Sequence, residues 1–166
     1  MLLRWRRRAE GQAEAIKWFR RIEDETGSVQ GYLGVLYGVP KGYAEAVNWY
    51  RKAAETGNAY AQHNLGRCYR IGQGVPANDV EVAKWYRMAA DRGILYAQYY
   101  IGHCYSDGIG VPKDSVVAYM WLNIASAAGN AEAKKGREAI EGQMTRDEIS
   151  EGQKLSREWK PTKPAD

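Results

Sequence analysis

The sequence is poor in several residue types on which common folds and sites depend. Its 166 residues include one phenylalanine, two cysteines and five prolines. No apolar run approaches the roughly 20 residues that a membrane-spanning helix needs. The arginine-rich start is not followed by an apolar core, so it does not read as a secretory signal. We therefore expect a cytoplasmic protein, unless a leader has been removed or the chain is a fragment of a longer repeat array.

The two cysteines are too widely spaced for a small disulfide framework. Cys68 and Cys104 occupy the same position in two successive copies of a repeat. Equivalent atoms of stacked helical repeats lie about 8–10 Å apart. A disulfide needs Cα atoms within about 7 Å. We predict two free thiols, as in a reducing compartment.

The overall composition is that of a folded protein with a modest charge. Hydrophobic residues make up 45% of the chain, charged residues 27%, and the net charge is +4. Such a balance excludes intrinsic disorder as the general state of the chain. Most of the positive charge comes from the two ends, so it does not by itself predict a nucleic-acid partner.

A repeat with a period of 36 residues dominates the sequence. The motif Trp-Tyr-Arg-x-Ala-Ala-x-x-Gly begins at Trp49 and again at Trp85, and Trp121 follows at the same interval. Two further motifs recur with the same offset: Leu65-Gly66-x-Cys68-Tyr69 with Ile101-Gly102-x-Cys104-Tyr105, and Gly72-x-Gly74-Val75-Pro76 with Gly108-x-Gly110-Val111-Pro112. A fixed period of this length is typical of solenoids, in which each unit stacks on its neighbours.

Each period divides into two helices. Apolar residues at helical spacing predict a first helix over about 58–71, which the glycines and proline that follow would end. Asn78 is the expected N-cap of the second helix, with Glu81 completing a capping-box-like pair. The next second helix begins at Asp114 and runs to Gly129. The prediction is an all-α, right-handed superhelix of stacked helical hairpins.

The ends depart from the repeat. We assign residues 1–160 to one solenoid with a degenerate N-terminal repeat over 12–57, full repeats over 58–93 and 94–129, and a capping hairpin over 130–160. The degenerate repeat has a shortened first helix, because Tyr37 runs directly into Gly38-Val39-Pro40. In the capping hairpin, Thr145 and Glu148 form a capping box that opens the last helix. Residues 161–166 are expected to be a flexible tail.

The two full copies of the unit resemble the Sel-one-like repeat family, a relative of the tetratricopeptide repeats. The resemblance covers roughly residues 12–160 and rests on the Leu-Gly, Gly-x-Gly-Val-Pro and Trp-Tyr-Arg-x-Ala-Ala motifs. It implies an α-α hairpin solenoid acting as an adaptor or scaffold, in bacteria often linked to signalling, the envelope or host interaction. Some secreted members carry two cysteines per repeat. This chain has one, so their disulfide pattern is not implied.

Catalytic and metal chemistry find little support in the sequence. Gly72-x-Gly74 is not a phosphate loop, because a helix precedes it and Pro76 follows it. The histidines His63 and His103 occupy different repeat positions, and no C-x-x-C or H-x-x-x-H spacing is present to build a zinc site. No anchored nucleophile–base motif is present either. We therefore expect no enzyme activity, no cofactor, no metal and no small-molecule substrate.

The candidate binding residues lie on the first helix of each repeat. Four positions there face away from the apolar stripe, and three of them differ between copies although their frame is shared. In one copy they are Tyr60, His63, Asn64 and Arg67, and in the next Tyr96, Tyr99, Tyr100 and His103. First helices usually line the concave side of such solenoids, where partners bind. Large aromatic residues also pack between hairpins, and the sequence leaves binding and packing equally open.

The function that these features favour is a non-enzymatic scaffold that binds a peptide or a partner protein on its concave face. The alternative is a basic module for nucleic acid or anionic membrane, built from Arg4, Arg6, Arg7 and Arg8 around Trp5. A third possibility, an edge piece of a larger array, predicts self-association through the incomplete N-terminal repeat.

Overall fold

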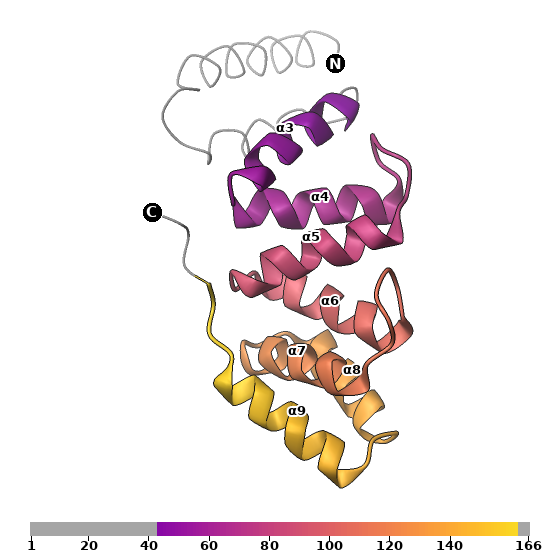
Figure 1. The fold of residues 1–166 in the computed structure, drawn as a ribbon, viewed down its shortest axis with the longest axis vertical. Helices are drawn as coiled ribbons and strands as arrows, with labels where there is room; N and C mark the ends of the chain where they lie inside the picture. The colour runs from indigo at the N-terminus through magenta and orange to yellow at the C-terminus, as the bar shows by residue number, and fades with distance from the viewer. Residues whose placement is uncertain (1–42, 163–166) are drawn as a thin grey trace, which may run out of the picture.

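The computed structural model describes residues 43–162, and within this range all regular secondary structure is α-helical (Figure 1). The helices follow one another down the long axis in chain order, as a solenoid requires. They are α3 (Tyr43–Glu55), α4 (Ala59–Ile71), α5 (Asp79–Asp91), α6 (Leu95–Asp107), α7 (Ser115–Ala127), α8 (Ala131–Glu141) and α9 (Arg146–Glu158). The predicted all-α solenoid is confirmed.

Side-chain caps define where these helices begin. Asn58, Asn78, Asp114 and Asn130 each accept a hydrogen bond from the backbone N–H three residues on. Such a bond satisfies one of the free N–H groups of the first turn. At the other end, α4 and α6 stop at Gly72 and Gly108, which adopt left-handed conformations with φ of 68° and 75°. The repeat motifs therefore act as start and stop signals.

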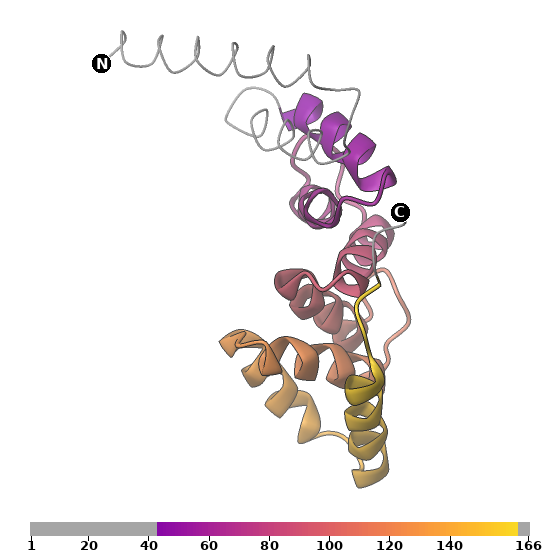
Figure 2. The ribbon, with the colours of Figure 1, turned by 90° about the vertical axis from the view of Figure 1, so that its left-hand side faces the viewer.

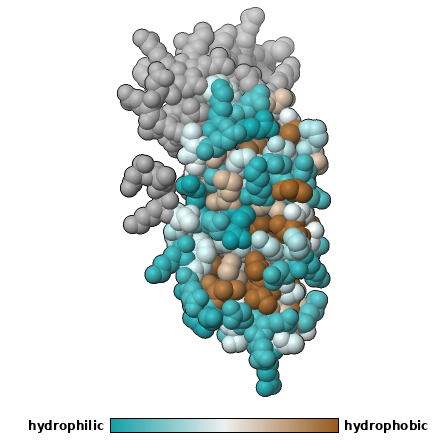
Figure 3. Space-filling model, in the orientation of Figure 1, coloured by the Kyte–Doolittle hydropathy of each residue, from teal (hydrophilic) through white to brown (hydrophobic). Residues whose placement is uncertain are grey.

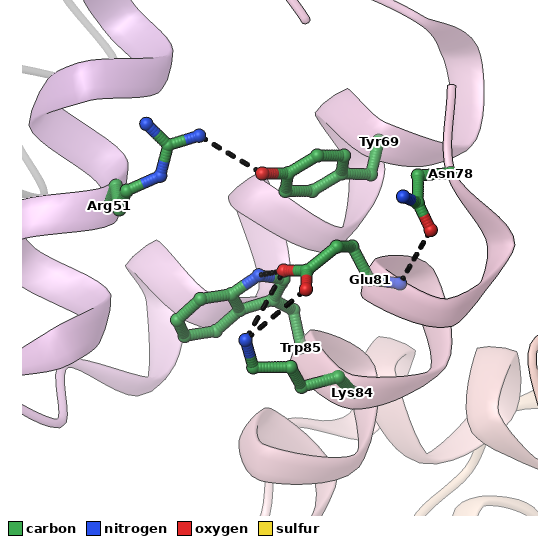
Figure 4. A network of polar contacts seen from close by, with 6 residues as sticks. All are labelled: Arg51, Tyr69, Asn78, Glu81, Lys84 and Trp85. Atoms are coloured by element: carbon green, nitrogen blue, oxygen red, sulfur yellow. Dashed lines mark hydrogen bonds and ion pairs between the residues drawn. The ribbon is translucent and has the colours of Figure 1, made fainter. Parts of the chain in front are cut away.

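One of the two expected capping boxes is complete and the other is not. In α9, Thr145 and Glu148 bond reciprocally to each other's backbone N–H, as predicted. In α5, Asn78 caps the helix, but Glu81 turns away from the cap (Figure 4). Its carboxylate instead accepts a 2.7 Å hydrogen bond from Nε1 of Trp85. The prediction of a box at Asn78 was therefore wrong at Glu81, because the indole N–H offers a closer partner.

The core is built from small residues where helices approach closely and from large ones between them. Ala53, Ala89 and Ala90 are fully buried. A side chain at Gly66 would meet the ring of Tyr86 at 3.0 Å, so glycine is what lets α4 lie close to α5. The largest fully buried side chains are Trp121, Tyr86, Leu65, Ile101, Leu122, Gln62 and Val82.

Two hydrogen bonds recur with the period of the sequence and join each hairpin to the next. Arg51 donates to the Tyr69 hydroxyl at 3.0 Å (Figure 4), and Arg87 donates to that of Tyr105 at 3.1 Å. A buried glutamine amide also reaches back to the preceding helix, from Gln62 to Ala54 O and from Gln98 to Ala90 O. These contacts explain why arginine, tyrosine and glutamine stand at fixed places in the repeat.

The last helix packs on α7 and not chiefly on its neighbour α8. After α9 the chain turns back along the stack toward α5, which Figures 1 and 2 both show. Its end is fixed there, because the backbone N–H of Thr162 donates to the carbonyl of Asp91 at 2.7 Å. Thr162 was expected in a flexible tail, and this hydrogen bond instead ties it to α5.

Several predictions fall on residues outside the described range. They are the arginines near the start, the truncated first helix of the degenerate repeat, self-association through that repeat, and the tail from residue 163 onward. The cysteines lie within the range. Both are free, as predicted, and both are buried, at 4% and 3% exposure.

Candidate functional site

The predicted binding residues divide into two groups in the structure. Tyr60 and Tyr96, one repeat apart, are 72% and 63% exposed, and Arg67 is also exposed. The others, His63, Asn64, Tyr99, Tyr100 and His103, are half-buried. The half-buried residues therefore take part in packing and the exposed ones do not, while binding at any of them stays a prediction.

An aromatic cluster occupies the space between α4, α5 and α6. The rings of Tyr86 and Tyr100 stack with centroids 4.9 Å apart, and Tyr99 meets Tyr100 edge-on at 5.1 Å. His103 meets Tyr99 edge-on at 4.7 Å, and His63 lies 5.6 Å from Tyr86 on the other side. Such ring pairs contribute about 0.5–1.5 kcal/mol each beyond their buried area. Tyr100 therefore holds two hairpins together as well as forming surface.

A cavity of about 250 Å³ opens beside this cluster. The α4 wall contributes Arg70, the floor on α5 contributes Val82 and Tyr86, and Asp79 stands at the start of α5. The remaining lining residues are Tyr99, Tyr100, His103, Cys104 and Ile109. We call this feature the α4–α6 groove. On the face seen in Figure 3, apolar residues reach the surface in patches among hydrophilic ones.

The sequence identified only part of the groove. Tyr99, Tyr100 and His103 were candidates and line it, whereas Tyr60, His63, Asn64, Arg67 and Tyr96 do not. The other lining residues were not among the candidate binding residues; they are Arg70, Asp79, Val82, Tyr86, Cys104 and Ile109. The missed signal is a comparison of repeats: one period later Arg70 becomes Ser106 and Tyr86 becomes Leu122.

Charge and burial act together on Tyr86 and Arg70. The Tyr86 side chain is fully buried, and its hydroxyl has no hydrogen-bond partner of acceptable geometry. Burial raises the pKa of Tyr86 to about 12, although the nearby Arg70 guanidinium opposes the rise. The phenol is therefore protonated at neutral pH and offers a donor. Arg70 also lies over the ring of Tyr100, at 4.9 Å from its centroid.

The pKa values of His63 and Cys104 are shifted so that both side chains are uncharged at neutral pH. Burial, with Arg67 and Arg70 close by, lowers the pKa of His63 to about 4. Burial raises the pKa of Cys104 to about 11, with Asp79 adding to the effect. A thiol with so high a pKa is a poor nucleophile. The groove thus presents an aromatic surface with one guanidinium and one carboxylate. These groups can hold a partner by apolar contact and by charge.

Metal ligands and membrane-spanning helices are not found in the described range. Within residues 43–162, no three His, Cys, Asp or Glu side chains lie together as a metal site would need. No helix of the described range is long and apolar enough to span a membrane.

Comparison with known proteins finds the same repeat. The family model of the Sel1 repeat matches residues 29–58, 59–94 and 95–130. A search of curated proteins found no match.

Two solved structures are similar to this chain over most of its length. One is c5321 of uropathogenic Escherichia coli, described as a protective antigen displaying an SLR fold, with 33% identity and a TM-score of 0.79. The match covers 89% of this chain and 32% of that one. The other is a Sel1 repeat protein from Oxalobacter formigenes, with 33% identity, a TM-score of 0.67, and coverage of 88% and 61%.

This chain therefore spans only part of the length of both relatives. Proteins with this repeat generally mediate protein–protein interaction on a non-enzymatic scaffold. With three matched repeats over more than half of its residues, the chain belongs to the Sel1 repeat family.

Proposed function

We propose that this protein is a scaffold that binds a peptide segment of a partner protein in the α4–α6 groove. The groove runs between two first helices of successive repeats and is floored by the second helix between them. This is the arrangement by which a solenoid offers an extended binding surface. Tyrosine, histidine and arginine line the groove and combine apolar area with hydrogen-bonding ends. Tyrosine and arginine are common anchors of interfaces.

The observation that carries the proposal is the difference between the residues at the same repeat positions in two successive repeats. Between α4 and α6 the repeat positions hold Arg70, Tyr86, Tyr99, Tyr100 and His103. Between α6 and α8 the same positions hold Ser106, Leu122, Lys135, Gly136 and Ala139. Packing of the shared frame does not require the aromatic set, because α6, α7 and α8 pack together without it. The aromatic residues therefore form a local feature of one groove.

Peptide selection tests the proposal. A random peptide library displayed on phage is selected against the purified chain, and the dissociation constants of the recovered peptides are measured by fluorescence polarisation. We expect His103→Ala to weaken binding about tenfold or more, equivalent to about 1.4 kcal/mol. His103 is suited to this test because it lies at the edge of the cluster, unlike Tyr100, which stacks on Tyr86.

The matched control is Tyr60→Ser, which removes an exposed tyrosine of α4 that does not line the groove. It should leave affinity unchanged. Circular dichroism melting of both variants separates lost contacts from lost structure. If recovered peptides bind His103→Ala as tightly as the unaltered protein, with both folded, the groove is not the binding site.

A further inference from the structure

We propose that the α4–α6 groove selects a peptide segment in which an acidic side chain stands beside an apolar anchor, the carboxylate meeting Arg70 and the hydroxyl of Tyr86. This inference rests on the proposed function and adds the chemistry of the partner. It is carried by three observations: a cation without an acidic partner, a buried donor without an acceptor, and an uneven distribution of charge around the cavity.

The cation is Arg70, in the last turn of α4. Its side chain is exposed and lines the cavity, and among the described residues it forms no ion pair. The guanidinium lies over the ring of Tyr100, which fixes its plane beside the groove. An arginine held this way has several N–H donors available to a carboxylate.

The buried donor is the hydroxyl of Tyr86, on the floor of the same cavity. It is fully buried, the Arg70 guanidinium is close enough to interact with its oxygen, and no described group accepts a hydrogen bond from it. A buried polar group that lacks a partner costs about 1–3 kcal/mol, so such groups are rare in a core and need a reason. The equivalent residue of the next repeat is Leu122, which shows that the frame accepts an apolar side chain there. An acceptor atom from a bound partner would satisfy the Tyr86 hydroxyl and Arg70 together.

The charges around the groove are arranged unevenly. Arg67 and Arg70 lie on α4, and neither forms an ion pair among the described residues. Asp79 is the one acidic residue among those lining the cavity, and it stands at the start of α5. A carboxylate of a partner is attracted to the α4 side and repelled near Asp79. This favours one carboxylate position and one direction of the bound segment.

The apolar anchor follows from the rest of the lining. Val82, Ile109 and the faces of Tyr99 and Tyr100 supply a surface that is mostly hydrocarbon. Ile109 is 36% exposed, so part of this surface is open to solvent in the free protein. Covering it with a leucine or aromatic side chain of a partner would remove apolar area from water on both sides.

A charge-reversal experiment tests the inference. Short immobilised peptides carry one leucine or tyrosine anchor, and the position beside the anchor holds glutamate, glutamine or lysine. Binding of the unaltered protein is compared with that of Arg70→Glu and of Arg157→Glu. Arg157 is an exposed arginine in the last turn of α9, which does not line the groove, so its variant is the matched control for net charge.

We expect the unaltered protein to prefer glutamate peptides over lysine peptides by about tenfold, since charged pairs across an interface contribute on this scale. Arg70→Glu should reverse the preference, and Arg157→Glu should keep it. Tyr86→Phe should lower affinity for the glutamate peptides by about fivefold, the loss of one hydrogen bond. Its melting temperature should change little, because no described group accepts a hydrogen bond from the hydroxyl that it removes and Arg70 is exposed to water.

The outcomes separate this inference from the proposed function. If peptides bind the groove with equal affinity whatever their charge, or Arg70→Glu fails to reverse the order, the inference is wrong while the groove remains a binding site. If no anchored peptide binds at all, the proposed function is wrong, and the inference that rests on it is wrong with it. If inorganic phosphate at low concentration displaces the glutamate peptides fully, Arg70 binds anions in general and the inference of an acidic peptide is also overturned.

Discussion

Single glycines in this chain serve two distinct purposes, and the structure separates them. Gly129 and Gly110 both adopt positive φ, of 94° and 67°. Nothing lies within 4 Å of a side chain built at Gly129, whereas one at Gly110 would collide with the backbone of Asp79 and Val80. The second glycine of the Gly-x-Gly-Val-Pro motif therefore lets the loop touch the preceding hairpin, in addition to allowing the turn. Gly74 does the same against Tyr43 and Ala44.

These two glycines give the first prediction. Gly129→Ala should lower the free energy of unfolding by about 1–2 kcal/mol, the cost of a left-handed backbone at a residue with a Cβ. Gly110→Ala should cost about 3 kcal/mol or more, because steric overlap adds to the same backbone cost. Urea denaturation followed by circular dichroism measures both. Equal losses in the two variants would show that the loop contact relaxes without cost.

The buried histidine gives a second prediction at this scale. The pKa of His63 falls from the ordinary 6.5 to about 4, because burial and the charges of Arg67 and Arg70 disfavour the imidazolium. The tyrosines around it, Tyr86, Tyr96 and Tyr100, are neutral neighbours. As the pH falls below about 6.5, His63 becomes protonated in the unfolded chain, whereas in the folded chain it stays neutral until the pH approaches 4. The free energy of unfolding should therefore decrease between about pH 6.5 and pH 4.

His63→Gln should flatten this part of the pH–stability curve, since glutamine does not titrate. The matched control is His103→Gln, which removes the other histidine and should leave the decrease in place. Thermal melting at intervals of pH measures all three proteins. A curve for His63→Gln as steep as that of the unaltered chain would contradict the assignment.

At the scale of helices, the same hydrogen bond occurs in two settings. Arg51–Tyr69 ties α3 to α4, and Arg87–Tyr105 ties α5 to α6. Tyr69 is only 9% exposed, while the second bond is exposed to solvent and Arg87 is shared with Asp91. Water competes less for a buried bond.

We therefore expect Tyr69→Phe to destabilise the protein by about 1.5–3 kcal/mol, the range for a hydrogen bond to a charged group. Tyr105→Phe should cost less than about 1 kcal/mol, as exposed charged contacts usually do. Denaturation of each variant measures the losses, and a double-mutant cycle with Arg51→Met tests whether the Tyr69 loss belongs to the pair. A loss at Tyr105 equal to that at Tyr69 would mean that burial does not govern this bond.

The elements that follow the period were predictable from the sequence, and those that depart from it were not. The motifs that contain Trp85, Cys104 and the glycines that end the helices each occur in two copies 36 residues apart. A helix predicted in one copy is therefore supported by the same pattern in the other. The packing of α9 on α7 has no such support, because the last hairpin lacks the repeat motifs. The burial of Tyr86 follows from the sequence, but its place in the lining of the groove does not. A stripe on one helix predicts burial, but it does not show which neighbouring helix leaves a cavity beside the ring.

For the whole molecule, the order of contacts predicts a graded stability. Apart from α9, which packs on α7, each helix packs mainly on its neighbours in sequence, so the stack behaves as a one-dimensional array whose ends open first. The C-terminal end is closed by α9 and by Trp159, whose ring meets that of the fully buried Trp121 at 5.8 Å. Beyond it, Thr162 bonds to Asp91 on α5, four helices back in the chain. This segment thus fastens the last hairpin to the middle of the stack.

Trp159→Ala should therefore loosen one end of the array and not the other. We expect a loss of about 2 kcal/mol, below the 3–5 kcal/mol of a fully buried tryptophan because Trp159 is half-buried. Native-state hydrogen exchange should show faster exchange in α7, α8 and α9, with α4 and α5 little changed. Lys160→Ala, an exposed change next to it, is the control and should leave exchange as it is. A uniform rise over every helix would mean instead that the described repeats unfold as one cooperative unit. In that case the end fastening would stabilise the α4–α6 groove as much as the last hairpin.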